Sequence, residues 1–186
     1  EGIQSTGTAA CPKHFAVNSQ ELRRMASDSI VDERTMREIY LTGFEIVCRT
    51  AKPRAIMSSY NLVNGTHAHE NKHLLTDILR TEWGFDGMVV SDWGGSNSAV
   101  AAVRAGGSLE MPAPGLAGAR QIVEAVEAGE LDAADVYARA QEVLNVAAAS
   151  AGLPAPTPYD LDEHHKLATR IASESITLLR NDGDLL

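Results

Sequence analysis

Polar and ionisable side chains stand at the ends of three short apolar segments of this sequence. In chain order they are Lys13-His14, Tyr60-Asn61 and Asp92-Trp93. An ammonium group, an imidazole, a phenol and a carboxylate gathered at one mouth could hold a polyhydroxylated ligand. The carboxylate could also act on that ligand as a nucleophile. Whether these groups meet depends on the elements that carry them.

Four short apolar runs predict buried strands, because each is followed closely by a turn or polar signal. They are Cys11–Phe15, Ala55–Tyr60, Met88–Asp92 and Ser108–Met111. Longer helical patterns separate them, and strand alternating with helix is typical of right-handed βαβ units with a parallel sheet. In such folds the carboxyl ends of the strands form the active-site face. The sequence therefore predicts an α/β fold that brings the polar strand ends together.

The helical patterns have recognisable starts and stops. The first runs through Met36, Ile39, Tyr40, Gly43 and Val47 after Asp32. The second comprises Leu74, Leu75, Ile78 and Leu79 between Asn71 and Gly84, and the third Ile122, Val123 and Val126 before Gly129. A longer one follows Asp132 through Val136, Ala140, Val143, Leu144 and Ala147 to Gly152. A last pattern, Leu167, Ile171, Ser175 and Leu178, follows a proline-rich segment.

Each polar strand end also has a purely structural interpretation. Lys13 and His14 are acceptable as ordinary strand-end residues, Tyr60 opens a stretch that contains an Asn-Gly turn signal, and Asp92 is acceptable as a helix cap. Their shared placement favours a site, whereas each residue taken singly favours structure. The residues alone leave both interpretations open.

Other polar residues give weaker signals. Glu110 ends the fourth strand and could line the mouth, and Glu21 could pair with Arg23 or Arg24. His67, His69 and Glu70 lack the spacing of a helical zinc motif. We therefore expect neither a metal site nor an organic cofactor.

Composition excludes some classes of partner. The net charge of −9 disfavours nucleic acid and anionic membranes, and no apolar run approaches the length of a membrane span. Cys11 and Cys48 form neither a disulfide framework nor a metal pattern, so we expect two reduced core thiols, consistent with a cytoplasmic setting.

Several segments resemble, in order and spacing, those of family 3 glycoside hydrolases. They are Lys13-His14-Phe15-Ala16-Val17-Asn18 with Gln20-Glu21-Leu22 and Arg24, Met57-Ser58-Ser59-Tyr60-Asn61 with Asn64-Gly65, Trp83-Gly84-Phe85, Val90-Ser91-Asp92-Trp93, Leu109-Glu110-Met111-Pro112 and Ser173 to Asn181. The likeness spans essentially the whole chain. It implies that Asp92 is the catalytic nucleophile. It assigns substrate binding to Lys13, His14, Arg24, Met57, Tyr60 and Trp93.

The resemblance also implies the architecture. Four strands are too few for a closed eight-stranded barrel of about 250 residues. We expect residues 1–152 to be the C-terminal half of a (β/α)8 TIM-type barrel, 153–161 a linker, and 162–186 the first helix of an α/β sandwich domain. In the family's β-glucosidase-like branch, that sandwich domain supplies the acid/base glutamate. The chain is thus expected to be cut at both ends and to lack part of its site.

The expected activity is retaining removal of β-linked glucosyl or similar units from non-reducing ends, with a β-glucoside or oligosaccharide as substrate. The expected protein partners of the chain are further copies of itself or the complementary segments of the same enzyme. Alternatives are a β-xylosidase or β-N-acetylhexosaminidase of the family, a non-catalytic sugar-binding homologue, or an aldolase-like barrel with Lys13 as Schiff-base former. Ala16 to Ser19 replaces the Pro-Gly-His-Gly of the N-acetylglucosaminidase branch, which favours the glucosidase-like branch. Ser108 replaces a common family aspartate, which puts one local hydrogen bond in doubt.

Overall fold

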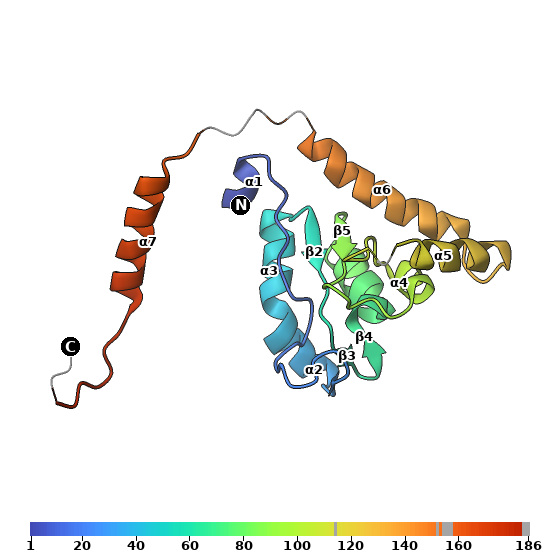
Figure 1. Ribbon diagram of the computed structural model, residues 1–186. Helices are drawn as coiled ribbons and strands as arrows, with labels where there is room; N and C mark the ends of the chain where they lie inside the picture. The colour runs from blue at the N-terminus through green and yellow to red at the C-terminus, as the bar shows by residue number, and fades with distance from the viewer. Residues whose placement is uncertain (114, 152, 154–157, 184–186) are drawn as a thin grey trace. The chain divides into compact units, whose positions relative to one another are not determined.

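The computed structural model describes residues 1–113, 115–151, 153 and 158–183. The chain divides into two units, Glu1–Gly152 and Leu153–Leu186, which are described separately (Figure 1). The first unit contains all of the strands found in the described residues and all of the predicted site residues.

In order, the elements are α1 (Gly2–Ser5), β1 (Asp28–Ser29), α2 (Glu33–Thr35), η1 (Met36–Leu41), α3 (Thr42–Ala51), β2 (Ala55–Met57), β3 (Leu62–Val63), β4 (Thr66–His67), η2 (Ala68–Glu70), η3 (His73–Glu82), β5 (Met88–Val90), α4 (Ala99–Ala105), α5 (Ala117–Glu127), α6 (Ala133–Ser150) and α7 (Leu161–Ser175). Helices separate the four predicted parallel segments, as the sequence predicts, although β2, β3 and β4 follow one another directly and the chain ends in consecutive helices.

Parallel pairing joins all four predicted strand segments. β2 pairs with β5 in the register Ala55↔Met88 to Met57↔Val90. The first and fourth segments add only single parallel bridges, Phe15↔Ser58 and Val90↔Leu109. The prediction of four full strands was therefore wrong for these two.

Local chemistry explains why the outer two segments are irregular. Pro12 has no N–H to donate, so its ladder with β2 is incomplete although its carbonyl accepts from Met57. On the other side, the amides of Ser108 and Leu109 both donate to the Val89 carbonyl, which prevents a regular register.

The first predicted helix is present, but the residues that face the core differ from the predicted ones. Three segments, α2, η1 and α3, run without a break from Glu33 to Ala51, and the Asp32 side chain accepts from Thr35 N as expected for a cap. The middle segment is π-helical, which inserts one residue into the repeat. Leu41 and Cys48 consequently face the core, whereas the predicted Ile39 is 69% exposed. Gly43 is also exposed.

The second helix matches its prediction most closely. All four predicted apolar residues are at most 1% exposed, and the Asn71 side chain accepts from Leu74 N at the start. Gly84 ends the element with φ +71°. This segment also forms a π-helix, η3, rather than an α-helix.

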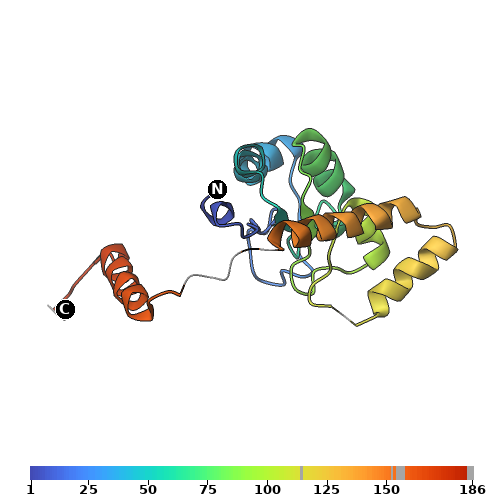
Figure 2. The same cartoon turned by 90° about the horizontal axis from the view of Figure 1, so that it is seen from above.

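The last two helices of the first unit are capped as predicted but less buried. Asp132 accepts from Ala134 N at the start of α6, which contacts β5 and α4 (Figure 2). Leu144 is 60% exposed and Val123 in α5 is 54% exposed, so the predicted stripes were wrong there. α6 ends at Ser150, and Gly152 lies outside the described residues.

The core lies between the parallel segments and the helices that follow them. Phe15 packs edge-on against Phe44 and Trp83, with ring centroids 5.1 and 5.9 Å apart. Cys48 belongs to this core and burial raises its pKa to about 11, but Cys11 is exposed, so the prediction of two core thiols was half wrong.

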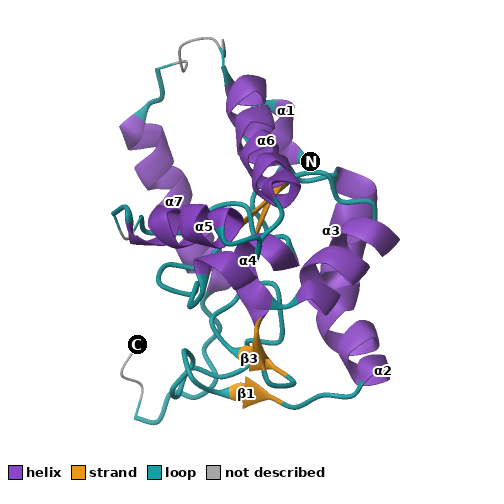
Figure 3. Cartoon of the chain, turned by 90° about the vertical axis from the view of Figure 1, so that its right-hand side faces the viewer, coloured by secondary structure: helices purple, strands orange, loops and turns teal. Residues whose placement is uncertain are grey.

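A second, small sheet was not predicted and holds the loop before α2. β1 lies parallel to β3, and the two strands are side by side in Figure 3. β3 forms a hairpin with β4 through the tight turn Asn64–Gly65. Leu62 N donates to the Ser27 carbonyl, and Ser29 Oγ donates to the Val17 carbonyl. The sheet thereby fixes both ends of the loop that carries Arg24.

The second unit contains one described helix, α7, whose Asp160 cap accepts from the amides of Asp162 and Glu163. All residues of α7 are exposed. Leu178 of the predicted stripe lies beyond its end at Ser175, and residues 154–157 of the predicted linker lie outside the described residues. No helix in the described parts of either unit is long and apolar enough to cross a membrane.

Candidate active site

Asp92 and His14 meet at the carboxyl ends of their parallel segments. Asp92 Oδ2 lies 3.2 Å from His14 Nε2, and Asp92 is 8% exposed. Its other oxygen, Oδ1, accepts a hydrogen bond of 2.7 Å from Trp93 N. The carboxylate is therefore held at both oxygens and still reaches the surface.

Tyr60 lies beside this pair. Its hydroxyl donates to the Trp93 carbonyl at 2.9 Å, and it also faces the Asp92 carboxylate. Burial, followed by the hydrogen bond and negative charge of Asp92, raises the pKa of Tyr60. The phenol is therefore a neutral donor next to the carboxylate at neutral pH.

Arg24 covers the ring of Tyr60. Its guanidinium carbon lies 4.5 Å from the ring centroid, a cation–π geometry. Of the two partners considered for Glu21, Arg24 is the one observed, at 2.6 Å. The loop from 18 to 30 thus delivers a cation to the edge of the site.

Glycines shape the loop after Asp92. Gly95 N donates to the Asp92 carbonyl, and a Cβ at Gly95 would lie 3.3 Å from the Tyr60 ring. Gly94 has φ +83° and its amide donates to the Met111 carbonyl. The next helix, α4, has Ser98 as its cap, so the interpretation of Asp92 as a helix cap was wrong.

The remaining predicted residues differ in how far their side chains are exposed. Trp93 is 59% exposed, and Met57 is half-buried at the end of β2, where it pairs with Val90. Lys13 is exposed, which does not match the apolar enclosure that activates a Schiff-base lysine. Asn61 is 1% exposed and donates to the carbonyls of Ala16 and Val17, directly after the first segment, so it is structural.

The weaker candidates are not part of this cluster. Glu110 lines a small hollow with His69 behind the strands, and burial raises the pKa of Glu110. The Glu70 carboxylate accepts from the amides of Asn97 and Ser98. No group of three or more side chains suited to a metal ion is found among the described residues.

Sequence reasoning missed a charge cluster at the opposite ends of the strands. Glu142 of α6 binds Arg80 at 2.8 Å and Arg139 at 2.6 Å. Ser108 Oγ donates to the same carboxylate at 2.5 Å and accepts from Val89 N at 2.8 Å. The hydrogen bonding at Ser108 is thus made by its hydroxyl together with Glu142, and no local pattern in the sequence pairs residues so far apart.

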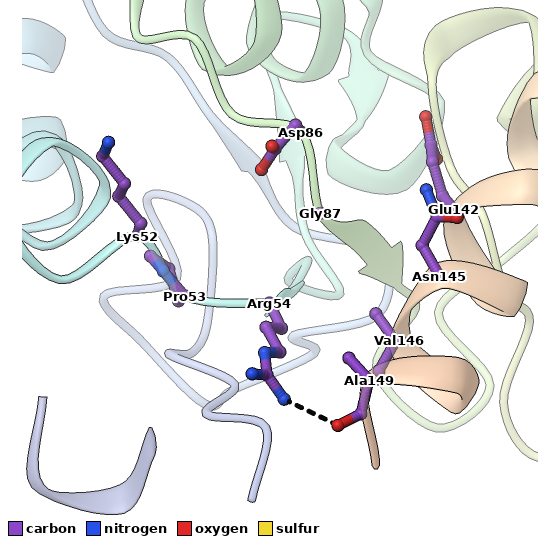
Figure 4. A pocket seen from close by; sticks show the side chains of 9 residues that line it. All are labelled: Lys52, Pro53, Arg54, Asp86, Gly87, Glu142, Asn145, Val146 and Ala149. Atoms are coloured by element: carbon purple, nitrogen blue, oxygen red, sulfur yellow. Dashed lines mark hydrogen bonds between the residues drawn. The ribbon is translucent and has the colours of Figure 1, made fainter. Parts of the chain in front are cut away.

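A hollow of about 180 Å³ also lies at this opposite end, between the starts of β2 and β5 and the last turns of α6 (Figure 4). Arg54 donates to the Ala149 carbonyl across it at 3.3 Å. Its lining mixes both charge signs without convergent groups. The candidate site is placed at the carboxyl ends because His14, Tyr60 and Asp92 converge there.

Residues 1–146 match the Glycosyl hydrolase family 3 N terminal domain. The chain belongs to glycoside hydrolase family 3. Its α/β fold matches solved structures of β-glucosidases of this family.

Named relatives in family 3 are similar across the chain. It is 46% identical over 187 residues to thermostable beta-glucosidase B of Acetivibrio thermocellus, covering 100% of this chain and 25% of that protein. It is 45% identical to a beta-glucosidase of Rhizobium radiobacter, covering 99% of this chain and 23% of that protein.

Solved family 3 structures are similar as well. Beta-glucosidase 3B from Thermotoga neapolitana in complex with glucose superposes with TM-score 0.88 at 38% identity, covering 99% of this chain and 27% of that one. The beta-glucosidase of Bifidobacterium adolescentis gives TM-score 0.85 at 40% identity, covering 100% and 27%. The chain thus spans about a quarter of the length of these relatives.

Proposed function

We propose that the polypeptide containing this chain is a retaining, exo-acting β-glucoside hydrolase with Asp92 as its nucleophile. The single observation that carries the proposal is the contact between Asp92 and His14 at the shared carboxyl ends of parallel segments. Relatives named β-glucosidases and a relative crystallised with glucose support the substrate class.

The geometry suits covalent catalysis by a carboxylate. Asp92 Oδ1 is occupied by Trp93 N–H, which leaves Oδ2, beside His14, to attack an anomeric carbon and form a glycosyl-enzyme. The leaving oxygen takes a proton from a second carboxyl group, which retaining enzymes place about 5–5.5 Å away. We assign that proton donor to the following domain of the complete polypeptide.

Roles for the other residues follow from where their side chains lie. His14 and Arg24 offer donors to sugar hydroxyls around the carboxylate, and we assign the same role to Lys13, the neighbour of His14. Trp93 is exposed, so it offers a flat apolar face to the leaving group or to the neighbouring sugar. Met57 bounds the inner wall. Water then hydrolyses the glycosyl-enzyme from the side that the leaving group has vacated, which gives net retention.

The same proposal assigns the architecture. Residues 1–152 would be the C-terminal half of the (β/α)8 barrel, 153–161 the linker, and 162–186 the start of the sandwich domain. The two outer parallel segments are each paired on one side only within the described residues, and the preceding barrel strands would complete both ladders.

A glycone panel with anomer analysis tests the activity. The complete polypeptide is assayed on aryl β-glucoside, β-xyloside and N-acetyl-β-glucosaminide, and proton NMR follows the first anomer released. We expect the glucoside to be preferred and β-glucose to form before mutarotation. An α-anomer formed first would contradict retention, whereas preference for another glycone would move the assignment to the xylosidase or hexosaminidase alternative. Binding without turnover would indicate a non-catalytic homologue.

Removing the Tyr60 hydroxyl is expected to slow the reaction. Tyr60→Phe removes the hydroxyl that faces Asp92 and donates to the Trp93 carbonyl, so kcat/KM for an aryl β-glucoside should fall by about three- to tenfold, as expected for one neutral hydrogen bond. Tyr137→Phe is the matched control, because Tyr137 is 76% exposed on α6. Equal activity of the two variants would exclude Tyr60 from the site.

A further inference from the structure

His69 is buried directly behind the strand that leads to Asp92. It is 1% exposed, and its Nδ1 lies 2.9 Å from Ser58 Oγ. The other side of the ring packs on Gly107, where a Cβ would come within 2.6 Å of Nε2. The imidazole therefore spans from the end of β2 to the start of the fourth segment.

Both of the segments that His69 contacts are bonded to β5, one from each side. Ser58 N donates to the Val90 carbonyl at 2.9 Å. Next to Gly107, Ser108 N donates to the Val89 carbonyl at 2.8 Å. The ring thus braces the two neighbours of β5, and Asp92 follows two residues after its end.

The surroundings favour an uncharged ring. Within the described residues, no carboxylate lies within ion-pair distance of His69. Glu110 lines the same hollow of about 70 Å³ from the fourth segment. Asp92 lies beyond the end of β5, two residues after Val90.

The charged groups of the adjoining elements are engaged elsewhere. Glu70 of η2 binds the amides of Asn97 and Ser98. Arg104 of α4 donates to the Glu130 carbonyl, and His73 of η3 pairs with Glu33. A proton on His69 would therefore place a charge in a buried site that has no carboxylate at ion-pair distance among the described residues.

We propose that His69 is a positioning residue for the Asp92 strand, and that its protonation releases this strand and so sets the acid limit of activity. The activity readout rests on the proposed function, whereas the stability readout does not.

The direction of the pH effect follows from the environment of the ring. Burial lowers the pKa of His69 to about 4 in the folded protein. An unfolded histidine has a pKa near about 6.5, so the unfolded chain binds this proton more strongly. Folding stability is therefore lost as pH falls from about 6.5 to about 4, and the loss is complete below that range.

The test compares His69→Asn with wild type in the complete polypeptide. Asparagine can keep a hydrogen bond to Ser58 but does not titrate. Between pH 6.5 and 4, the melting temperature of wild type should fall by roughly 5 °C more than that of the variant. The acid limb of kcat/KM should move to lower pH in the variant, with neutral-pH kcat/KM retained within about tenfold. His73→Asn, on an exposed ring that pairs with Glu33, should behave as wild type.

His69→Gln is a second variant in case asparagine does not support folding. If neither folds, histidine C2-hydrogen exchange in wild type, read by mass spectrometry on the peptide that contains His69, gives the ring's pKa directly. A ring that stays neutral below about pH 5 supports the proposal, and one that titrates above about pH 6 overturns it. The proposal would also be overturned if the folded variants and wild type showed the same change in melting temperature between pH 6.5 and 4 and the same acid limb of kcat/KM. If Asp92→Asn retained full activity, the proposed function would fail, while the pH dependence of the melting temperature would still test the role of His69.

Discussion

Replacing Asp92 with asparagine is expected to lower turnover of aryl β-glucosides by at least about a thousandfold, because the variant has no nucleophile. The amide can still accept from Trp93 N, so the loop keeps its main local hydrogen bond. The measurement is kcat in the complete polypeptide, with circular dichroism and melting temperature to show that the fold is retained.

Two comparisons make this result specific. Asp86→Asn alters an exposed aspartate at the opposite end of the strands and should leave kcat unchanged. Asp92→Gly should regain part of its turnover when azide is added, because the small anion attacks the anomeric carbon from the vacated side. The product should then be the α-glucosyl azide. Near-wild-type turnover of Asp92→Asn would sink the assignment.

Replacing Glu142 with glutamine is expected to cause the largest loss of stability. The change leaves Arg80 and Arg139 without their carboxylate, and breaking a buried pair by removing one partner costs about 3–5 kcal/mol. Burial, opposed mainly by Glu142, already lowers the pKa of Arg80 to about 10. Calorimetry of the complete polypeptide should show the unfolding transition of the domain that contains Glu142 lowered by roughly 10 °C.

The chain offers both a control and a rescue for this variant. Glu38→Gln breaks an exposed pair with Arg34 and should change the free energy of unfolding by less than about 0.5 kcal/mol. Ser108→Asp in the Glu142→Gln background should recover part of the loss, since Ser108 Oγ lies 3.4 Å from Arg80 Nη2. If Glu142→Gln melted like Glu38→Gln, the cluster would not stabilise the fold.

The sequence predicts the alternation of strand and helix well because that alternation is a local pattern. Caps such as Asp32 and Asp132 and the apolar stripe of η3 act within one helical turn, and all are observed. The π-helical insertion in η1 depends on packing against the core, which periodicity does not report. This is why Ile39 is exposed and Leu41 is buried.

The candidate site could be predicted only in part, because local patterns place some of its residues and packing between distant residues places the others. Strand-end placement brings His14, Tyr60 and Asp92 together, and these three do converge. The bracing role of His69 and the contact between Glu142 and Ser108 depend on residues 11 and 34 positions apart, which no spacing rule connects. The predicted burial of Cys11 was wrong, because its side chain is exposed whereas Phe15 of the same segment is buried.

The most direct test of the nucleophile is mass spectrometry after incubation with an activated 2-deoxy-2-fluoro-β-glucoside. The fluorine slows both steps, and the activated leaving group keeps formation of the glycosyl-enzyme faster than its hydrolysis. We predict that the complete polypeptide gains the mass of one fluoroglucosyl group, and that peptide mapping places the group on Asp92. An adduct on a different carboxylate, or turnover of the reagent without any adduct, would contradict Asp92 as the nucleophile.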